Sequence, residues 1–511
     1  MARMRPELQI LTAAEAVARI SDGATVACSG LVGAGHPEAL TAALEKRFMD
    51  DNSPHDLTLV YAAGQGDGGR RGLNHLAHPG LLKRVIGGHW NLTPRLGKLA
   101  LAGDIEAYCF PQGVICQLFR DIAAHRPGVI TKIGLNTFID PANGGGRLNT
   151  KTTEPLVERV QLDGEEWLRF RSFPVDVALI RATFADRAGN LTMEREGLVG
   201  EVLPMAQAAR NHGGLVIAQI EKISDHPAAP HAVRVPGMLI DALVIAGPGE
   251  HGQTFAELFN PSYVEAGRSV APAPMPFSER KIIARRVLRE IGRGSIVNLG
   301  IGMPEGVVPV AAEEGRLDEF TLTLESGPIG GMPAGGLSFG CSAHPEAIID
   351  QPAQFDFYDG GGLDVAVLGA VTINSEGSVN ISALGDRFAG VGGFVDISQN
   401  TSKVVFCCPF RAGGLDVGVD NGRLQIRTEG RHCKFVKSIP QVAFHGPSAR
   451  ERGQEVIYIT ERAVFRLGDE GLDLIEVASG IETDNDICAQ MEFRPTIVKP
   501  HTMPADCFRK D

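Results

Sequence analysis

The sequence predicts an α/β protein made of two related open α/β domains, with the ligand site between them. Short apolar strands followed by glycine-rich loops and amphipathic helices recur along the chain, which is the pattern of open α/β sheets. Residues 293–305 repeat the pattern of residues 22–38, and residues 364–377 repeat that of residues 176–189, in the same order. Two ordered repeats indicate a duplicated unit.

The length of the chain also indicates more than one domain. A chain of 511 residues is too long for one hydrophobic core. Prolines and glycines gather at residues 247–252 and at residues 271–276, a composition typical of a linker. We therefore predict an N-terminal α/β domain at residues 1–250, a linker at residues 251–278 and a C-terminal α/β domain at residues 279–511.

The overall composition excludes some classes of partner. The formal net charge is -12, so we expect neither a nucleic acid nor an anionic membrane as the main partner. No apolar run reaches the about eighteen residues that a membrane-spanning helix needs, and no signal peptide precedes the first expected helix. The nine cysteines form no C-x-x-C pair, which favours free thiols in a reducing compartment. We therefore expect a cytoplasmic protein.

The first half begins with alternating helices and strands. We expect a helix at residues 12–20, a buried strand at 24–28, a glycine-rich loop at 29–38 and a helix at 39–48. A strand, a glycine loop and a helix in this order offer free backbone N–H groups to an anion or to a carbonyl oxygen.

The next strand is followed by a glycine pattern. We expect this strand at residues 57–63, and residues 64–69 then match the dinucleotide pattern G-x-G-x-x-G. A dinucleotide site needs an acidic residue about twenty residues later to bind the ribose. No Asp or Glu occurs between Arg70 and Gly103, so we interpret the match as fortuitous. The basic side chains within residues 70–98 fit a solvated face, with a contact to an anionic ligand as the alternative.

The rest of the first half supplies loops and further elements. Residues 110–114 and 134–141 have the composition of loops, with polar groups between apolar segments. We expect a strand, a turn and a strand within residues 176–192, a helix at 204–211 and a strand at 215–220.

The second half starts with an expected helix at residues 279–291 and ends in a strand-rich segment. The alternation of Phe320, Leu322 and Leu324 with threonines predicts a strand at residues 320–324. Further strands are expected from the apolar runs at residues 403–408, 441–446, 456–460, 463–467 and 472–478.

Glu325 follows the strand expected at residues 320–324 and precedes a segment rich in glycine and proline. Its side chain should therefore lie at a strand end, beside backbone that a ligand can approach closely. Ligands of open α/β sheets bind at such strand ends, where a carboxylate can act as a base, a metal ligand or a covalent nucleophile. A surface glutamate is the alternative interpretation.

Several motifs of the chain resemble those of one enzyme family. Residues 298–304, 325–331 and 390–394 resemble the signatures of family I CoA-transferases. Further segments resemble the acetate/propionate branch, the short-chain acyl-CoA:carboxylate CoA-transferases, in which one chain joins both halves of the enzyme. These segments are residues 64–68, 71–77, 81–90 and 111–114.

The resemblance implies a duplicated CoA-transferase unit and a covalent mechanism at Glu325. The carboxylate of Glu325 would attack an acyl-CoA, hold coenzyme A as a glutamyl-CoA thioester and pass it to a second carboxylate in ping-pong order. The substrates would be a short-chain acyl-CoA and small carboxylates of the acetate or propionate type. Coenzyme A would be substrate and transient covalent adduct, with no tightly bound cofactor. The chain would form a homo-oligomer, a dimer or a tetramer.

The resemblance also implies binding roles for two glycine-rich loops. The residues that would flank the thioester and coenzyme A are Gly300, Ile301, Gly302, Met303, Gly392 and Gly393. Gln112 would lie near the acyl carboxylate, with an amide that caps a loop as the alternative interpretation. Relatives of the ketoacid branch carry an Asn-Asn pair where this chain has residues 64–66, which weakens the transfer of acyl-pocket roles to this region.

Other residues are weaker candidates, and two other functions remain open. Cys341 has only His344 as a nearby basic residue in the sequence, so we expect a packed small side chain rather than a nucleophile. The 14 histidines show no metal-ligand spacing, so we expect no metal site. An acyl-CoA hydrolase on the same scaffold would consume acyl-CoA without an added carboxylate. A non-catalytic acyl-CoA-binding sensor would not need Glu325.

Overall fold

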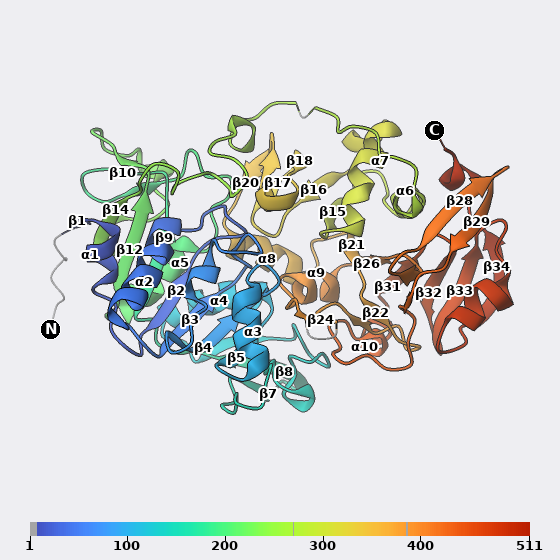
Figure 1. Ribbon diagram of the computed structural model, residues 1–511, viewed down its shortest axis with the longest axis horizontal. Coiled ribbons are helices and arrows are strands. Elements are labelled where there is room, and N and C mark those ends of the chain that lie inside the picture. The colour runs from blue at the N-terminus through green and yellow to red at the C-terminus, as the bar shows by residue number, and fades with distance from the viewer. Residues whose placement is uncertain (1–7, 269, 385–386, 511) are drawn as a thin grey trace.

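The computed structural model describes residues 8–268, 270–384 and 387–510, and each half of the chain contains one large sheet (Figure 1). The first sheet has eight strands, all parallel, in the order β1-β14-β12-β9-β2-β3-β4-β5. In that order the strands are Gln9–Leu11, Ala242–Ile245, Leu215–Ile220, Val177–Arg181, Thr25–Cys28, Leu57–Tyr61, Leu82–Gly87 and Glu106–Cys109. Every residue of β9 is buried, as expected for a central strand whose two faces are both covered.

The second sheet has ten strands in the order β20-β17-β16-β15-β21-β26-β31-β32-β33-β34. The strands from β16 to β31 are parallel, whereas β31, β32 and β33 form an antiparallel meander. In sheet order the strands are Ala347–Ile348, Pro328–Ile329, Thr321–Thr323, Ile296–Leu299, Val365–Gly369, Lys403–Cys407, Glu455–Ile459, Ala463–Gly468, Gly471–Val477 and Thr496–Thr502.

The two sheets share a repeated core of five parallel strands. The order β14-β12-β9-β2-β3 in the first sheet corresponds to β31-β26-β21-β15-β16 in the second. One hydrogen bond repeats as well. The Thr25 N–H donates to Asp176 Oδ2 at 2.8 Å, and the Ile296 N–H donates to Asp364 Oδ2 at 2.8 Å. Each aspartate thus holds the start of the neighbouring strand in the same way, which supports the duplication inferred from the sequence.

Helices cover these sheets. In the first half they are α1 (Ala13–Val17), α2 (Glu38–Asp51), α3 (Pro94–Ala102), α4 (Gln112–Ala123) and α5 (Val202–Asn211). In the second half they are α6 (Glu279–Leu288), α7 (Val307–Glu313), α8 (Gln351–Asp359), α9 (Phe394–Asn400) and α10 (Gly446–Glu451).

Short strands form smaller sheets around these layers. Those of the first half are β6 (Gly128–Thr131), β7 (Val157–Leu162), β8 (Glu165–Arg171), β10 (Phe184–Ala185), β11 (Leu191–Thr192) and β13 (Lys222–Ile223). Those of the second half are β18 (Met332–Pro333), β19 (Ser342–Ala343), β22 (Thr372–Ile373), β23 (Val379–Asn380), β24 (Ala383–Leu384), β25 (Arg387–Phe388), β27 (Arg411–Ala412), β28 (Asp416–Asp420), β29 (Arg423–Thr428) and β30 (His432–Cys433).

The two halves meet along α4, which contacts both α8 and α9. The contact is close because α4 carries Gly113 there. A Cβ atom at Gly113 would lie 2.7 Å from the ring of Phe355 in α8 and 2.6 Å from Asp396 Oδ1 in α9. One large hydrophobic core includes buried side chains of both halves, such as Phe119 and Phe355. The two halves are therefore packed against each other through a shared core.

Several expected elements differ from the observed ones, including the following three. The helix expected at residues 12–20 is the short α1, which Thr12 and Glu15 start with a capping box. The loop expected at residues 110–114 ends at Pro111, and α4 begins at Gln112. The strand expected at residues 441–446 is absent from the described residues, since that segment makes only an isolated bridge between Val379 and Phe444. Within the same described residues, no helix combines the length and the apolar character that crossing a membrane requires.

Candidate active site

Glu325 lies just beyond β16 at the carboxyl edge of the second sheet. The strand is shorter than the residues 320–324 expected, because the chain turns sharply after it. The Leu324 N–H donates to the Pro328 carbonyl at 2.9 Å, and the Gly327 N–H donates to the Leu324 carbonyl at 3.0 Å. Gly327 has a φ of 116°, which favours glycine over residues with a side chain. This turn fixes the backbone at Glu325.

Glu325 lines a cavity of about 360 Å³. Five of the other residues expected at the site line the same cavity: Gly300, Ile301, Met303, Gly392 and Gly393. These residues come from two loops, one at residues 300–303 and one at residues 392–393. Gly302 belongs to the first loop but does not line the cavity. The fold thus brings together two loops that are about ninety residues apart in the sequence, as parallel strands with aligned carboxyl ends do.

The first loop follows β15 and begins at Gly300. The Gly300 N–H donates to the Val367 carbonyl of β21 at 2.8 Å, so the loop starts as an extension of the sheet. Gly302 has a φ of 85°, which turns the chain away from the strand direction. Ile301 at the turn remains 55% exposed, so its side chain is accessible to a ligand.

The second loop contains Gly392 and Gly393 and is bonded to the first half of the chain. The N–H groups of Val391 and Gly392 both donate to the Gly88 carbonyl, at 3.0 and 2.8 Å. The Gln112 N–H in turn donates to the Gly392 carbonyl at 2.9 Å. A Cβ atom at Gly393 would lie only 3.3 Å from Glu325 Oε2. The first half therefore holds this loop against the Glu325 carboxylate.

Gln112 is buried at the first turn of α4, next to the second loop. Its side-chain Oε1 would lie 3.5 Å from a Cβ atom at Gly392, but Gln112 does not line the cavity. Its Nε2 has no hydrogen-bond partner among the described residues. The structure thus brings Gln112 to the loop rather than to the cavity wall.

Few groups around Glu325 could stabilise the charge of its carboxylate. Burial raises the pKa of Glu325 to about 7. Among the described residues, no hydrogen bond or ion pair engages its carboxylate. Lys434 is the other charged residue lining the cavity, and its Nζ donates to the carbonyls of Ala370 and Val371 at 2.6 and 3.2 Å. A carboxylate without strong partners keeps its electron pairs available for attack.

The cavity wall also includes residues that were not expected from the sequence, and three of them have nitrogen-bearing polar side chains: His89, Asn298 and Lys434. His89 lies just beyond β4, and Asn298 lies in β15 with its Oδ1 unpartnered among the described residues. The position at the carboxyl end of a parallel strand, the signal that pointed to Glu325, applies to His89 as well.

Other candidates from the sequence have structural roles or partners. Cys341 is fully buried, and a Cβ atom at Gly197 would lie 2.5 Å from its Sγ, so this cysteine fills packed space. Residues 64–69 are followed by a 3₁₀ turn rather than by a long helix, unlike a dinucleotide site. Of the basic residues that follow, Arg84 pairs with Glu106 at 2.5 Å and Arg71 lies over the Phe255 ring.

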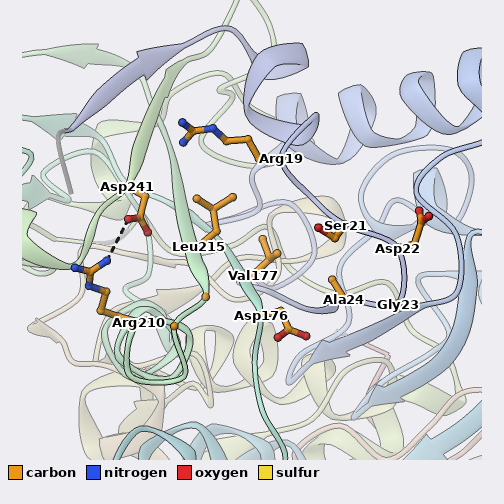
Figure 2. A pocket seen from close by; sticks show the side chains of 12 residues that line it. Arg19, Ser21, Asp22, Gly23, Ala24, Asp176, Val177, Arg210, Leu215 and Asp241 are labelled. Atoms are coloured by element: carbon orange, nitrogen blue, oxygen red, sulfur yellow. Dashed lines mark hydrogen bonds and ion pairs between the residues drawn. The ribbon is translucent and has the colours of Figure 1, made fainter. Parts of the chain in front are cut away.

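A larger hollow of about 580 Å³ lies at the amino edge of the first sheet (Figure 2). The side chains around it include Arg19, Asp176, Arg210 and Asp241, and the last two form an ion pair at 3.3 Å. Ligands of open parallel sheets bind at the carboxyl ends of the strands, so this hollow is on the wrong edge for the site.

The chain is similar to known CoA-transferases over nearly its whole length. The coenzyme A transferase family matches residues 10–246. Caffeate CoA-transferase of Acetobacterium woodii is 42% identical over 498 residues, with 96% of this chain and 95% of the relative covered. Acetate CoA-transferase YdiF of Escherichia coli K12 is 40% identical over 501 residues, with 97% and 94% covered. A crystal structure of the E. coli O157:H7 acyl-CoA transferase YdiF as a thioester complex with CoA has a TM-score of 0.93 at 38% identity, covering 99% of this chain and 98% of that chain.

Proposed function

This chain belongs to the coenzyme A transferase family and has CoA-transferase activity, and we propose that Glu325 carries coenzyme A between a short-chain acyl-CoA and a free carboxylate. One observation supports the role of Glu325 above others. Its carboxylate lies in a cavity at a strand end, close to Gly393, and no described side chain pairs with it. A solved relative is described as a thioester complex with CoA, which is the kind of intermediate that this proposal requires.

The proposed reaction proceeds through two exchanges at carbonyl carbons. A carboxylate oxygen of Glu325 attacks the thioester carbon of the acyl-CoA, and the C–S bond breaks to give a mixed anhydride and CoA thiolate. The thiolate then attacks the side-chain carbonyl of Glu325, and the donor acid leaves as a carboxylate. The remaining glutamyl-CoA thioester reacts with the second carboxylate by the reverse of both steps, so no water is consumed.

Backbone N–H groups of the two loops are the proposed donors to the oxyanion of each step. The N–H groups of Gly300 and Gly392 already donate to Val367 and Gly88 within the protein. This leaves the neighbouring N–H groups of Ile301 and Gly393 for the oxyanion. A well-placed donor of this kind stabilises the transition state by about 3 kcal/mol.

The apolar walls and the size of the cavity favour a small apolar acyl group. The apolar side chains that line it include Ile381, Val391, Phe394 and Ile397. The cavity of about 360 Å³ must hold the thiol end of coenzyme A as well as the acyl chain. An acetate- or propionate-type substrate fits these conditions.

The names of the relatives do not identify the acyl group that this chain transfers, because two relatives of similar identity are named for different acids, caffeate and acetate. Initial rates with acetate, propionate, butyrate and caffeate as acceptors, at one acyl-CoA concentration, would rank the substrates. The proposal predicts that kcat/KM for acetate or propionate exceeds that for caffeate at least tenfold. The opposite ranking would contradict the short-chain assignment and leave the transferase activity in place.

The role of Glu325 is tested by a single turnover without acceptor. Wild-type protein mixed with acetyl-CoA should release about one equivalent of acetate per site and then stop, since coenzyme A stays on the enzyme. Glu325→Gln should release none, and Glu325→Asp, whose carboxylate is about 1.5 Å short, should release it at least a hundredfold more slowly. Continued release of acetate without acceptor would instead indicate a hydrolase.

We also propose a homo-oligomer, a dimer or a tetramer, and a cytoplasmic location. Large apolar side chains are exposed on the first half and on the linker expected at residues 251–278, for example Met238 at 63% and Leu258 at 75%. Burial of such side chains between copies would stabilise an oligomer. Light scattering after size exclusion measures the mass in solution, and a mass near 54.4 kDa would contradict the oligomer.

A further inference from the structure

His89 reaches the cavity of Glu325 from the other half of the chain. It lies just beyond β4 of the first sheet and forms a backbone bridge with Gly390 of the second loop. The same cavity is lined by His89, Glu325, Gly392 and Gly393. His89 is therefore the part of the first half that faces the reacting groups most directly.

Two glycines define how the His89 ring sits. A Cβ atom at Gly64 would lie 2.4 Å from Nδ1, and a Cβ atom at Gly392 would lie 3.7 Å from Cδ2. The two glycines thus lie nearer to the Nδ1 and Cδ2 sides of the ring than to the end with Cε1 and Nε2. The contact also explains the first glycine of residues 64–69, because any side chain at Gly64 would displace the imidazole of His89.

The ring is uncharged near neutral pH. Burial lowers the pKa of His89 to about 4, and no described carboxylate pairs with the ring. A neutral imidazole has one N–H donor and one acceptor nitrogen. Within the described part of the chain, neither nitrogen has a hydrogen-bond partner, so the donor is available to a ligand.

We propose that the Nε2–H group of His89 binds the acceptor carboxylate, donating a hydrogen bond to the oxygen that does not attack the glutamyl-CoA thioester. This inference rests on the proposed function of Glu325. A carboxylate accepts a stronger hydrogen bond than a thioester carbonyl does, because it is charged. A neutral donor also suits the reaction, since an ion pair with a cation would stabilise the free carboxylate more than the partly neutralised transition state.

The test separates the two halves of the reaction. Enzyme is first converted to its glutamyl-CoA form with acetyl-CoA, freed of acetate and excess acetyl-CoA, and then mixed with increasing concentrations of propionate. The rate of propionyl-CoA formation at each concentration gives the half-saturating propionate concentration. This quantity reports acceptor binding, while the yield of the glutamyl-CoA form reports the donor step.

Two amide variants of His89 have similar polarity but side chains of different length. The amide nitrogen of His89→Gln can occupy about the place of Nε2, whereas that of His89→Asn is placed near Nδ1. We expect His89→Asn to raise the half-saturating propionate concentration about 10- to 100-fold, the loss of one hydrogen bond to a charged group. His89→Gln should stay within about threefold of wild type, and so should the exposed control His226→Gln. Both His89 variants should form the glutamyl-CoA adduct in wild-type yield.

Other outcomes overturn the inference in distinguishable ways. If wild-type protein forms no glutamyl-CoA adduct, the proposed function itself fails. If wild type forms it and His89→Asn saturates at the wild-type propionate concentration, His89 does not bind the acceptor. A folded His89→Asn protein that forms no adduct would show that His89 is required for formation of the glutamyl-CoA thioester itself, which the inference does not predict. An equal loss in both variants, with a lowered unfolding temperature, would assign it a structural role.

Discussion

At the scale of single residues, the partners of a buried carboxylate decide its chemistry. Burial alone would raise the pKa of Glu196, but Arg181 and His251 outweigh it and lower the pKa to about 2. Burial without such partners raises the pKa of Glu325 to about 7 and that of Glu201 to about 8. Glu196 is thus a fixed anion of the scaffold, whereas Glu325 is an anion of higher basicity and stronger nucleophilicity.

The raised pKa of Glu325 predicts how the donor half-reaction depends on pH. Only the ionised carboxylate attacks acetyl-CoA, so the single-turnover rate of acetate release should rise about tenfold per pH unit below pH 7 and level off above it. Stopped-flow or rapid-quench measurements between about pH 5 and pH 9 check this. A rate that is flat between pH 5 and pH 7 would contradict a desolvated nucleophile.

Glu201 predicts a pH dependence of stability. Neither of its carboxylate oxygens has a partner among the described residues, and burial raises its pKa from 4.5 to about 8. Between these pH values the folded chain holds a proton that the unfolded chain has released, so stability falls as pH rises. The loss from about pH 5.5 to about pH 8 is on the order of 3 kcal/mol.

Replacement by the neutral amide should remove this loss. The free energy of unfolding of Glu201→Gln should therefore fall less between about pH 5.5 and about pH 8 than that of wild type, as measured by denaturant unfolding at each pH. An exposed control, Glu194→Gln, should keep the wild-type slope. Equal slopes for wild type and Glu201→Gln would mean that Glu201 is hydrated or paired in the folded state.

At the scale of elements, the second loop links the two halves of the site. Gly88 just beyond β4 accepts two hydrogen bonds from the loop, and α4 donates a third to Gly392. These bonds place Gly393 at the N-terminus of α9, next to Glu325. The loop therefore lies close to the carboxylate and carries the proposed oxyanion donor.

A methyl group at Gly393 should disturb this contact without strain in the backbone. Gly393 has a φ of -82°, which alanine adopts readily, but its Cβ would lie 3.2 Å from Ile397 and 3.3 Å from Glu325 Oε2. We expect Gly393→Ala to slow the single-turnover release of acetate about 10- to 100-fold, since near-attack geometry tolerates little displacement. Gly97→Ala in α3, where a Cβ has no neighbour within 4 Å, is the control and should leave the rate unchanged.

The sequence predicted those elements whose signals are local. The strands at β12 and β31 to β33 agree with their apolar runs within a residue or two, because buried strands are bounded by turn residues. The strand expected at residues 441–446 was wrong, since an apolar run does not reveal whether a partner strand is available. Gln112 was expected in a loop because residues 110–114 place polar groups between apolar segments. The structure instead starts α4 there, and Gly113 allows this helix to pack closely against α8 and α9.

The part of the candidate site that the second half of the chain contributes was largely predictable from the sequence. Glu325 and the two glycine loops were expected from the sequence, and the structure gathers Glu325 and most of the loop residues around one cavity. His89 and Lys434 were not expected, because their role depends on contacts between segments far apart in the chain. No sequence motif marks such residues. For His89, its position just after the carboxyl end of a parallel strand, β4, is the one signal that could have been used.

At the scale of the whole molecule, the site depends on both halves being joined. Gln112 and His89 come from the first half, whereas Glu325 comes from the second. One hydrophobic core includes Phe119 of α4 and Phe355 of α8. We propose that residues 1–250 and 279–511 are the two domains and that this shared core couples their unfolding.

The shared core predicts one cooperative unfolding transition. Calorimetry of the full chain should give a single heat-capacity peak, and loss of CoA-transferase activity should follow the same curve. Introducing a side chain at Gly113, as in Gly113→Val, should lower the unfolding temperature of both halves together, because its Cβ would meet Phe355 and Asp396. Two resolved peaks in wild type would contradict the coupling.

The central claim, that Glu325 holds coenzyme A covalently, is tested most directly by peptide mass measurement. Protein is incubated with acetyl-CoA without acceptor, digested at low pH, and the peptide that contains Glu325 is measured. The account predicts a mass higher by that of coenzyme A less one water, which hydroxylamine converts to the hydroxamate and which Glu325→Gln lacks. An adduct on a different residue would contradict it, and so would the formation of propionyl-CoA after propionate is added if no adduct is found before that addition.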